Sequence, residues 1–173
     1  ALAVTGTSTL TTAAADAVIT LGSTNALGGN VILSTAGTAG HVTIDNGTTA
    51  LGVEGTVNGN LALTSGEAIT DSGTLTVTGT TTVTTDVNDK VINLGTLAST
   101  GNVILSTMGT AGHATIDNTT TALGVEGTVN GNLALTSGEA ITDSGTLTVT
   151  GTTTVTTDVN DKVINLGTLA STG

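Results

Sequence analysis

The strongest constraint on the fold is an internal duplication. Residues 29–100 recur as residues 101–172, a period of 72, and only three positions differ between the two copies. The changes are Ala36 to Met108, Val42 to Ala114 and Gly47 to Thr119. Residues 1–28 form a partial, diverged copy of the same unit. Because self-similarity at a fixed period is typical of stacked repeats, we expect residues 1–173 to form one continuous structure.

Within each unit a shorter phrase recurs, in which a glycine precedes alternating apolar residues. Two examples are Gly29-Asn30-Val31-Ile32-Leu33 and Gly73-Thr74-Leu75-Thr76-Val77. Alternation with a period of two predicts β-strands. Gly, Asn, Asp or Ser ends each run after about four to six residues. No segment sustains the helical spacing of apolar residues, so the chain is predicted to be all-β.

The composition favours a thin core over a thick globular one. The chain has no Phe, Trp or Tyr, so its interior must be filled by small aliphatic side chains. Near-identical units fit a sandwich poorly, because each strand of a sandwich has its own environment. In a stack each coil meets a similar neighbour. We therefore predict a parallel β-solenoid with roughly three to four coils per 72-residue repeat and about seven to nine coils in all.

The apolar positions of the alternating runs predict the residues that line the interior. Because parallel strands lie about 4.8 Å apart, we expect these side chains to stack in ladders, with like resting on like. The predicted interior residues are Val31, Leu33, Val42, Ile44, Leu61, Leu63, Ile69, Leu75, Val77, Val83, Ile92 and Leu94. Residues such as Thr76 and Asn93 are expected to face outward, and by parity so are Ile32 and Val91.

Two segments carry a resemblance to a known family. The segment 59–83 and the following Asn88-Asp89-Lys90-Val91-Ile92-Asn93-Leu94 resemble the repeats of large bacterial exoproteins of the filamentous-haemagglutinin-like type. The resemblance covers essentially the whole chain. It implies a right-handed parallel β-helix, export to the bacterial cell surface, and a role in adhesion, biofilm or filament formation. It carries no binding residue over to this chain.

The charge balance narrows the range of partners. Thirteen acidic residues against two basic ones give a net charge of −11. Nucleic acid is not an expected partner, because phosphate binding depends on Lys and Arg. Without a run of about 18 apolar residues, no membrane insertion is expected. We expect end-to-end self-association into fibres, because a solenoid end presents unpaired strand edges, and contact with host-cell or environmental surfaces.

An acidic loop in each repeat is the candidate metal site. Its oxygen-bearing residues are Asp86, Asn88 and Asp89, which recur as Asp158, Asn160 and Asp161. Oxygen ligands at this density suit Ca²⁺. The loop lacks the glycine and the distal Glu of an EF-hand, and Lys90 can instead pair with Asp86 or Asp89. We therefore expect a polar turn without a cofactor, with calcium as the alternative.

No arrangement of side chains predicts catalysis. His41 and its copy His113 are expected to be exposed strand residues, because Asp45 lies four residues from His41, about 13 Å along a strand. Three carboxylates raise the possibility of glycoside cleavage, and they are Glu54, Glu67 and Asp71. Such sites also need aromatic side chains or Arg to hold the sugar, and the chain has neither. We therefore expect no enzymatic activity.

The sequence predicts a structural extracellular repeat protein that forms a rod or fibre on the bacterial surface. Its role would be that of an adhesin stalk or of a biofilm or filament component. The alternative is a module that binds glycans or ice through Thr/Asn-rich sheet faces. An ordered Thr grid needs Thr at equivalent places on every coil, and outward residues such as Asn30, His41 and Ala62 interrupt it.

Overall fold

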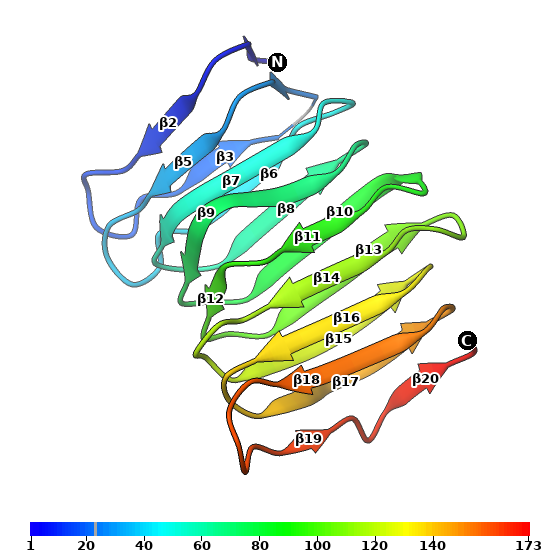
Figure 1. The fold of residues 1–173 in the computed structure, drawn as a ribbon. Helices are drawn as coiled ribbons and strands as arrows, with labels where there is room; N and C mark the ends of the chain where they lie inside the picture. Colours follow the sequence, from blue (N-terminus) through cyan, green and yellow to red (C-terminus); the bar gives the residue numbers. More distant parts are fainter. Residues whose placement is uncertain (23) are drawn as a thin grey trace.

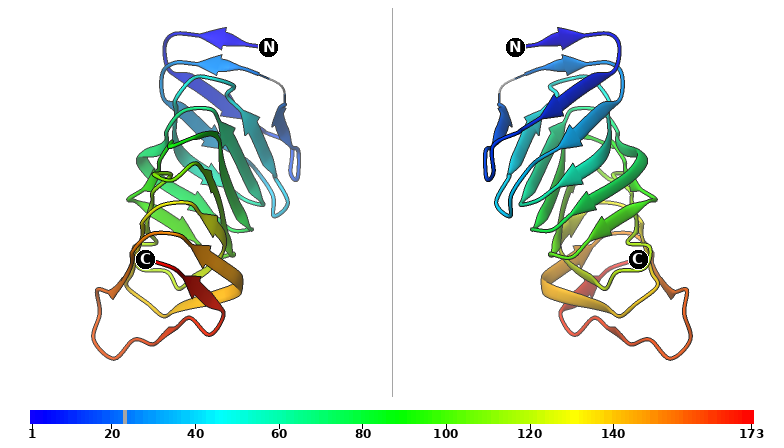
Figure 2. Two further views of the ribbon diagram at one scale, coloured as in Figure 1. Left: turned by 90° about the vertical axis from the view of Figure 1, so that its right-hand side faces the viewer. Right: turned by 90° about the vertical axis from the view of Figure 1, so that its left-hand side faces the viewer.

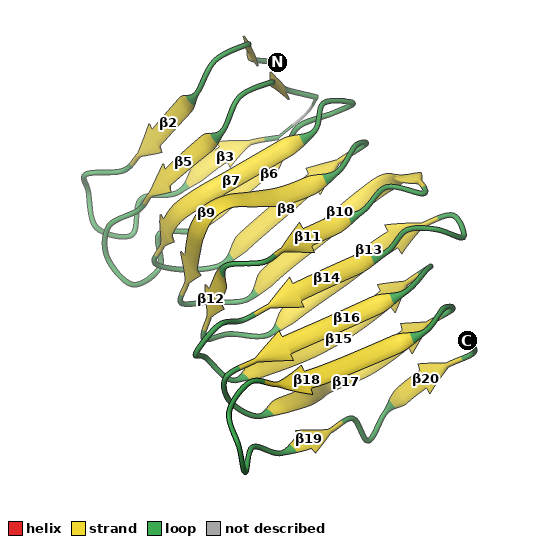
Figure 3. Ribbon diagram, in the orientation of Figure 1, coloured by secondary structure: helices red, strands yellow, loops and turns green. Residues whose placement is uncertain are grey.

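The computed structural model describes residues 1–22 and 24–173, which form a parallel β-solenoid of about eight turns (Figure 1). Every recorded pairing between strands is parallel. The described residues contain strands, turns and loops but no helix (Figure 3). The fold class and the number of coils predicted from the sequence are confirmed.

Two nine-stranded sheets form opposite walls of the described stack (Figure 2). The first, sheet 1, contains β2 (Ser8–Thr11), β5 (Val31–Ser34), β7 (Leu51–Val57), β9 (Ile69–Val77), β11 (Ile92–Leu94), β12 (Leu97–Ser99), β14 (Ala114–Asp117), β16 (Leu133–Ser137) and β18 (Thr153–Thr157). The second, sheet 2, contains β3 (Ile19–Leu21), β6 (Val42–Asp45), β8 (Leu61–Ser65), β10 (Thr81–Asn88), β13 (Val103–Met108), β15 (Leu123–Val129), β17 (Ile141–Val149), β19 (Ile164–Asn165) and β20 (Leu169–Ser171). A short pair, β1 (Ala3–Val4) with β4 (Ala26–Leu27), lies at the N-terminal end.

The core is a narrow column of aliphatic side chains between the two sheets. All twelve residues predicted to line the interior are at most 1% exposed. They stack in register from coil to coil, as in the ladder that joins Val42 to Leu61 and Leu61 to Thr81. Each coil therefore buries its apolar face against its neighbours as well as across the column.

The 72-residue repeat takes three and a half turns. The chain visits the sheets alternately through β5, β6, β7, β8, β9, β10, β11 with β12, and then β13. The strand β13, the copy of β5, therefore lies in sheet 2, whereas β5 lies in sheet 1. The same exchange of sheets holds for β6 with β14 and for each later pair of copies. The predicted stacking of aliphatic side chains from coil to coil is present, but the two copies of one residue do not stack on each other, because they lie half a turn apart around the column.

The long strands β7 and β9 bend at a glycine corner. Their pairing shifts register between Val53, which pairs with Asp71, and Gly55, which pairs with Leu75, so β9 has two more residues than β7 at this corner. Gly55 adopts a φ of 110°, and a Cβ at this position would lie 2.1 Å from the carbonyl oxygen of Leu33. Only glycine tolerates both the positive φ and this close approach of backbone. The corner recurs at Gly127, on the opposite sheet.

A buried asparagine, directly after the end of β6, takes the place of a strand pairing. Asn46 is fully buried, its Oδ1 accepts the backbone N–H of Leu27 at 2.8 Å, and its Nδ2 donates to the Leu27 carbonyl at 3.1 Å. Nδ2 also donates to the carbonyls of Thr49 and Ala50, both at 3.0 Å. The side-chain amide thus imitates a peptide group at the end of the ladder. Asn118 does the same next to β12, one repeat later.

Candidate functional surfaces

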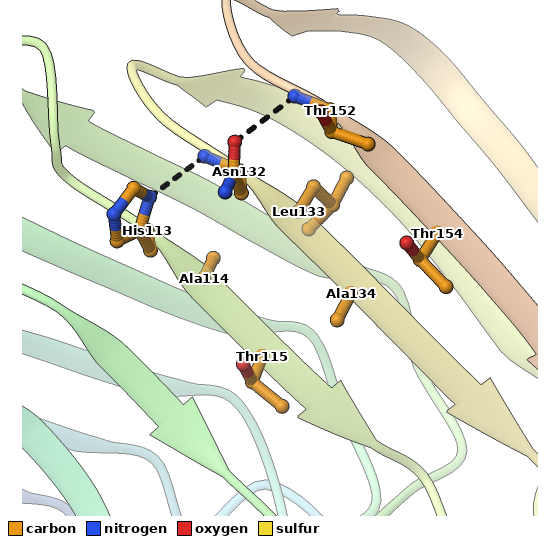
Figure 4. A pocket seen from close by; sticks show the side chains of 8 residues that line it. All are labelled: His113, Ala114, Thr115, Asn132, Leu133, Ala134, Thr152 and Thr154. Carbon is orange, nitrogen blue, oxygen red and sulfur yellow. Dashed lines mark hydrogen bonds between the residues drawn. The ribbon is translucent and has the colours of Figure 1, made fainter.

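Each repeat carries a relay of hydrogen bonds from a histidine across three coils. Nδ1 of His113 accepts the backbone N–H of Asn132 at 2.8 Å, and Oδ1 of Asn132 accepts the backbone N–H of Thr152 at 3.0 Å (Figure 4). The first repeat has the same relay from His41 through Asn60, with the same two distances. All four of these His and Asn side chains are exposed, which matches the position expected for His41 and His113.

A shallow groove of about 450 Å³ lies over the relay of the second repeat. Its walls come from three neighbouring coils, and the residues that line it are His113, Ala114, Thr115, Asn132, Leu133, Ala134, Thr152 and Thr154 (Figure 4). No carboxylate or ammonium group lines this groove, although the protein carries a net charge of −11. The groove therefore offers hydroxyl, amide and imidazole groups to a ligand rather than charges.

The acidic loop of the first repeat holds the next coil in place. Oδ1 of Asp89 accepts the backbone N–H groups of Thr110 and Ala111, both at 2.8 Å. These two bonds are the main reason why the pKa of Asp89 is lowered, because they favour its charged form. Asp89 adopts a φ of 62°, and Asp161 has a φ of 63°. Asp16 makes the same pair of bonds near the N-terminus. Asp89, one of the candidate calcium ligands, is thus engaged with backbone amides.

The other candidate calcium ligands lie on the outer side of the same loops. Asn88 is the last residue of β10 and is paired with Met108, and both Asp86 and Asn88 are exposed. Their copies Asp158 and Asn160 are exposed as well. In the part of the chain that the structure describes, no three His, Cys, Asp or Glu side chains lie together as a metal site would require.

The two lysines pair with a different residue from the one expected. Nζ of Lys90 lies 2.9 and 2.8 Å from the two carboxylate oxygens of Glu67, so the partner is neither Asp86 nor Asp89. The physical reason is the stacking, which places Lys90 directly over Glu67 of the preceding coil. Lys162 repeats the contact with Glu139 at 2.7 Å. Both lysines and both glutamates are partly exposed, so each pair is worth at most about 1 kcal/mol.

The three carboxylates considered for glycoside cleavage contact three different groups. Glu67 binds Lys90, and Asp71 accepts the backbone N–H of Thr96 at 2.6 Å. Glu54 lies over Gly73, where a Cβ would come within 2.3 Å of its Oε2. Each carboxylate therefore has a local structural contact.

Rows of hydroxyl groups run along the solenoid axis, a feature that was not predicted from the sequence. On sheet 2 one outward position per coil carries Thr64, Thr84, Ser106, Thr128 and Thr148, in register. On sheet 1 the corresponding row is Thr11, Ser34, Thr56 and Thr76. The rows include copies of the same repeat positions, and the half-turn offset places them on opposite walls.

Comparison with known proteins identifies one family. Residues 39–107 and residues 111–171 each match a family described as repeats of unknown function (DUF5649). The two matches begin one repeat apart, as the duplication requires. The chain matches no curated protein and no solved structure. The described residues include no helix long and apolar enough to cross a membrane.

Proposed function

The chain belongs to the family of repeats of unknown function (DUF5649), and we propose that it is a structural segment of an extracellular rod or fibre on the bacterial surface. In this role it acts as the stalk of an adhesin or as a component of a biofilm or filament. The proposal includes no enzymatic activity and no cofactor. The resemblance to filamentous-haemagglutinin-like exoproteins motivates the bacterial surface as its location.

The observation that carries the proposal is the uninterrupted core. Buried aliphatic side chains from Leu27 to Val149 form one cluster that runs through successive coils. In such a stack each coil contacts mainly its neighbours, so length can be added without redesigning the core. A rod built in this way is stiff because bending it would open backbone ladders on its convex side. Stiffness and extendable length are what a stalk or fibre requires.

The placement of equivalent surface residues on both sheets is a second argument for a role in a fibre. Because copies of one surface position alternate between sheet 1 and sheet 2, a long array displays each feature on both broad walls. A rod of this kind can contact neighbours on two sides, which suits a component of a matrix or bundle. Self-association end to end follows from the strand edges that a solenoid end exposes.

Electron microscopy of the purified chain over a range of concentrations tests this proposal. We expect short rods at low concentration and longer filaments of the same width at high concentration. Proline at two positions of the edge strand β18 whose backbone N–H groups point away from β16, Thr153→Pro and Thr157→Pro, removes donors from the free edge and should shorten the filaments. Isolated short particles at every concentration would contradict the self-association, and globular particles would contradict the rod itself.

A second candidate function is binding to glycans or ice, which the hydroxyl rows favour. Thr76 lies in the row on sheet 1 and Thr148 in the row on sheet 2, so a single substitution leaves one row intact. The double variant Thr76→Tyr with Thr148→Tyr interrupts both rows. If the rows bind, glycan-array binding or shaping of ice crystals by the native chain is lost in this variant. Thr48→Tyr, in an exposed loop, is the matched control.

A further inference from the structure

The relay can form only when both histidines are neutral and Nδ1 carries no hydrogen. A backbone N–H can only donate, so Nδ1 of His41 must be unprotonated to accept from Asn60, and Nδ1 of His113 must be unprotonated to accept from Asn132. A neutral imidazole with a free Nδ1 carries its proton on Nε2. Glycine makes this approach possible, because a Cβ at Gly59 would lie 2.7 Å from Nδ1 of His41. The second repeat has the same distance at Gly131.

The surroundings of each histidine contain one carboxylate that is held in its charged form. Asp16 interacts electrostatically with His41, and its pKa is lowered mainly by the backbone N–H bonds from Ala39 and Thr38. Asp89 stands in the same relation to His113, and Lys90 adds a positive charge next to Asp89. On the other side, the coil that donates to His41 presents Asn58, Gly59 and Asn60, which are uncharged. An imidazolium would therefore be attracted towards the preceding coil.

We propose that His41 and His113 form acid-sensitive hydrogen bonds between adjacent coils. When the imidazole is neutral, its Nδ1 accepts a hydrogen bond from the backbone N–H of Asn60 or Asn132 and so links two adjacent coils. When it is protonated, both ring nitrogens carry hydrogen and neither can accept, so that amide loses its partner. Imidazole side chains change charge between roughly pH 5 and 8, so mild acid loosens the corner.

The effect extends over three coils and reaches both walls of the rod. Asn60 also holds the N–H of Thr80 through its Oδ1, so a shift of the Asn60 segment weakens the next bond as well. His41 precedes β6 in sheet 2, whereas His113 precedes β14 in sheet 1. Acid therefore loosens equivalent corners on opposite sides in successive repeats.

Nuclear magnetic resonance of the intact chain tests the proposal at single residues. The ring ¹⁵N shifts at pH 8 should show Nε2–H tautomers for both histidines. The protection factors of the Asn60 and Asn132 amides should fall about fivefold between pH 8 and pH 5, the factor that corresponds to one lost hydrogen bond. The amide of Leu51, which donates to the Ala68 carbonyl at 2.9 Å and lies outside both relays, should keep its protection.

A matched variant separates titration of the imidazole from other effects of acid. His41→Asn with His113→Asn keeps an oxygen acceptor near the position of Nδ1 but cannot gain a proton in this range. In this variant the protection of Asn60 and Asn132 should be the same at pH 5 and pH 8. An Nδ1–H tautomer at pH 8 would overturn the proposal. Equal protection at both pH values in the native chain, while both histidines titrate, would overturn it too.

Discussion

Replacing Asn118 by alanine should be one of the most damaging single substitutions in this protein. Asn118 is fully buried, and its Oδ1 accepts the backbone N–H of Ser99 at 2.8 Å. Its Nδ2 donates to the carbonyls of Ser99, Thr121 and Ala122 at 2.9, 3.1 and 2.8 Å. Alanine removes all four bonds at once and leaves four backbone groups of the corner without their partner.

The size of the effect follows from the number of orphaned groups. A buried polar group without a partner costs about 1–3 kcal/mol, and carbonyl groups near the surface recover part of this by binding water. We therefore expect Asn118→Ala to lower the free energy of unfolding by about 3–5 kcal/mol. Asn118→Asp keeps the shape but replaces the donating Nδ2 by an acceptor that faces three carbonyls, so it should be at least as harmful at neutral pH.

Urea unfolding followed by circular dichroism measures the difference. Asn93→Ala is the matched control, because Asn93 faces outward and is exposed, and it should change the free energy by no more than about 0.5 kcal/mol. Since stacked repeats can unfold in parts, a separate early transition in Asn118→Ala would also agree with a local loss of stability. If Asn118→Ala unfolds at the same urea concentration as Asn93→Ala, the amide is not acting as a substitute for a strand.

Three further outcomes follow from the geometry. Gly55→Ala should cost about 3 kcal/mol or more in urea unfolding, because its Cβ would meet the Leu33 carbonyl at a positive φ, whereas Gly52→Ala should cost far less. The lowered pKa values of Asp16 and Asp89 mean that their stabilising contribution is present above the unfolded-state pKa and is lost as the pH falls through the lower folded-state value. The melting temperature should therefore decrease as the pH is lowered below about 4, and the double variant Asp16→Asn with Asp89→Asn should show a weaker dependence on pH. A chelator should leave the melting temperature unchanged, and a large decrease would instead support calcium at the acidic loops.

The interior of this protein could be predicted from the sequence because its signal is local. Alternation within a strand decides which side chain points inward, whatever lies on the neighbouring coil. Val31 and Leu33 face inward for this reason, and the chain offers no aromatic residue that would require a wider core. The 72-residue period indicated a stack for a similarly simple reason, since a stacked coil can reuse one set of contacts.

The contacts between coils could not be predicted, because they depend on the length of each coil. Lys90 meets Glu67, which is 23 residues away, whereas Asn60 meets His41 at a separation of 19 residues. The separation between paired residues changes from coil to coil, partly through the register shift at Gly55. Without the coil lengths, the sequence suggests ion-pair partners for Lys90 only among residues near it in the chain. The alignment of hydroxyl groups on successive coils cannot be predicted for the same reason.

The half-turn offset explains how two nearly identical repeats fit one continuous stack. A rotation of half a turn about the axis exchanges sheet 1 and sheet 2, and each strand keeps the copies of its former neighbours. In the first repeat β8 lies between β6 and β10, and its copy β16 lies between β14 and β18.

This exchange requires the two walls to be equivalent in width, register shifts and depth of core. A side chain suited to only one wall would fail in the next copy, where the same residue lies on the other. Small aliphatic side chains on both walls satisfy this condition, and a large aromatic ring on one wall would not. A period of three and a half turns places each position of the repeat on one wall in one copy and on the other wall in the next. The repeat length therefore requires side chains that fit both walls, which explains the uniform composition.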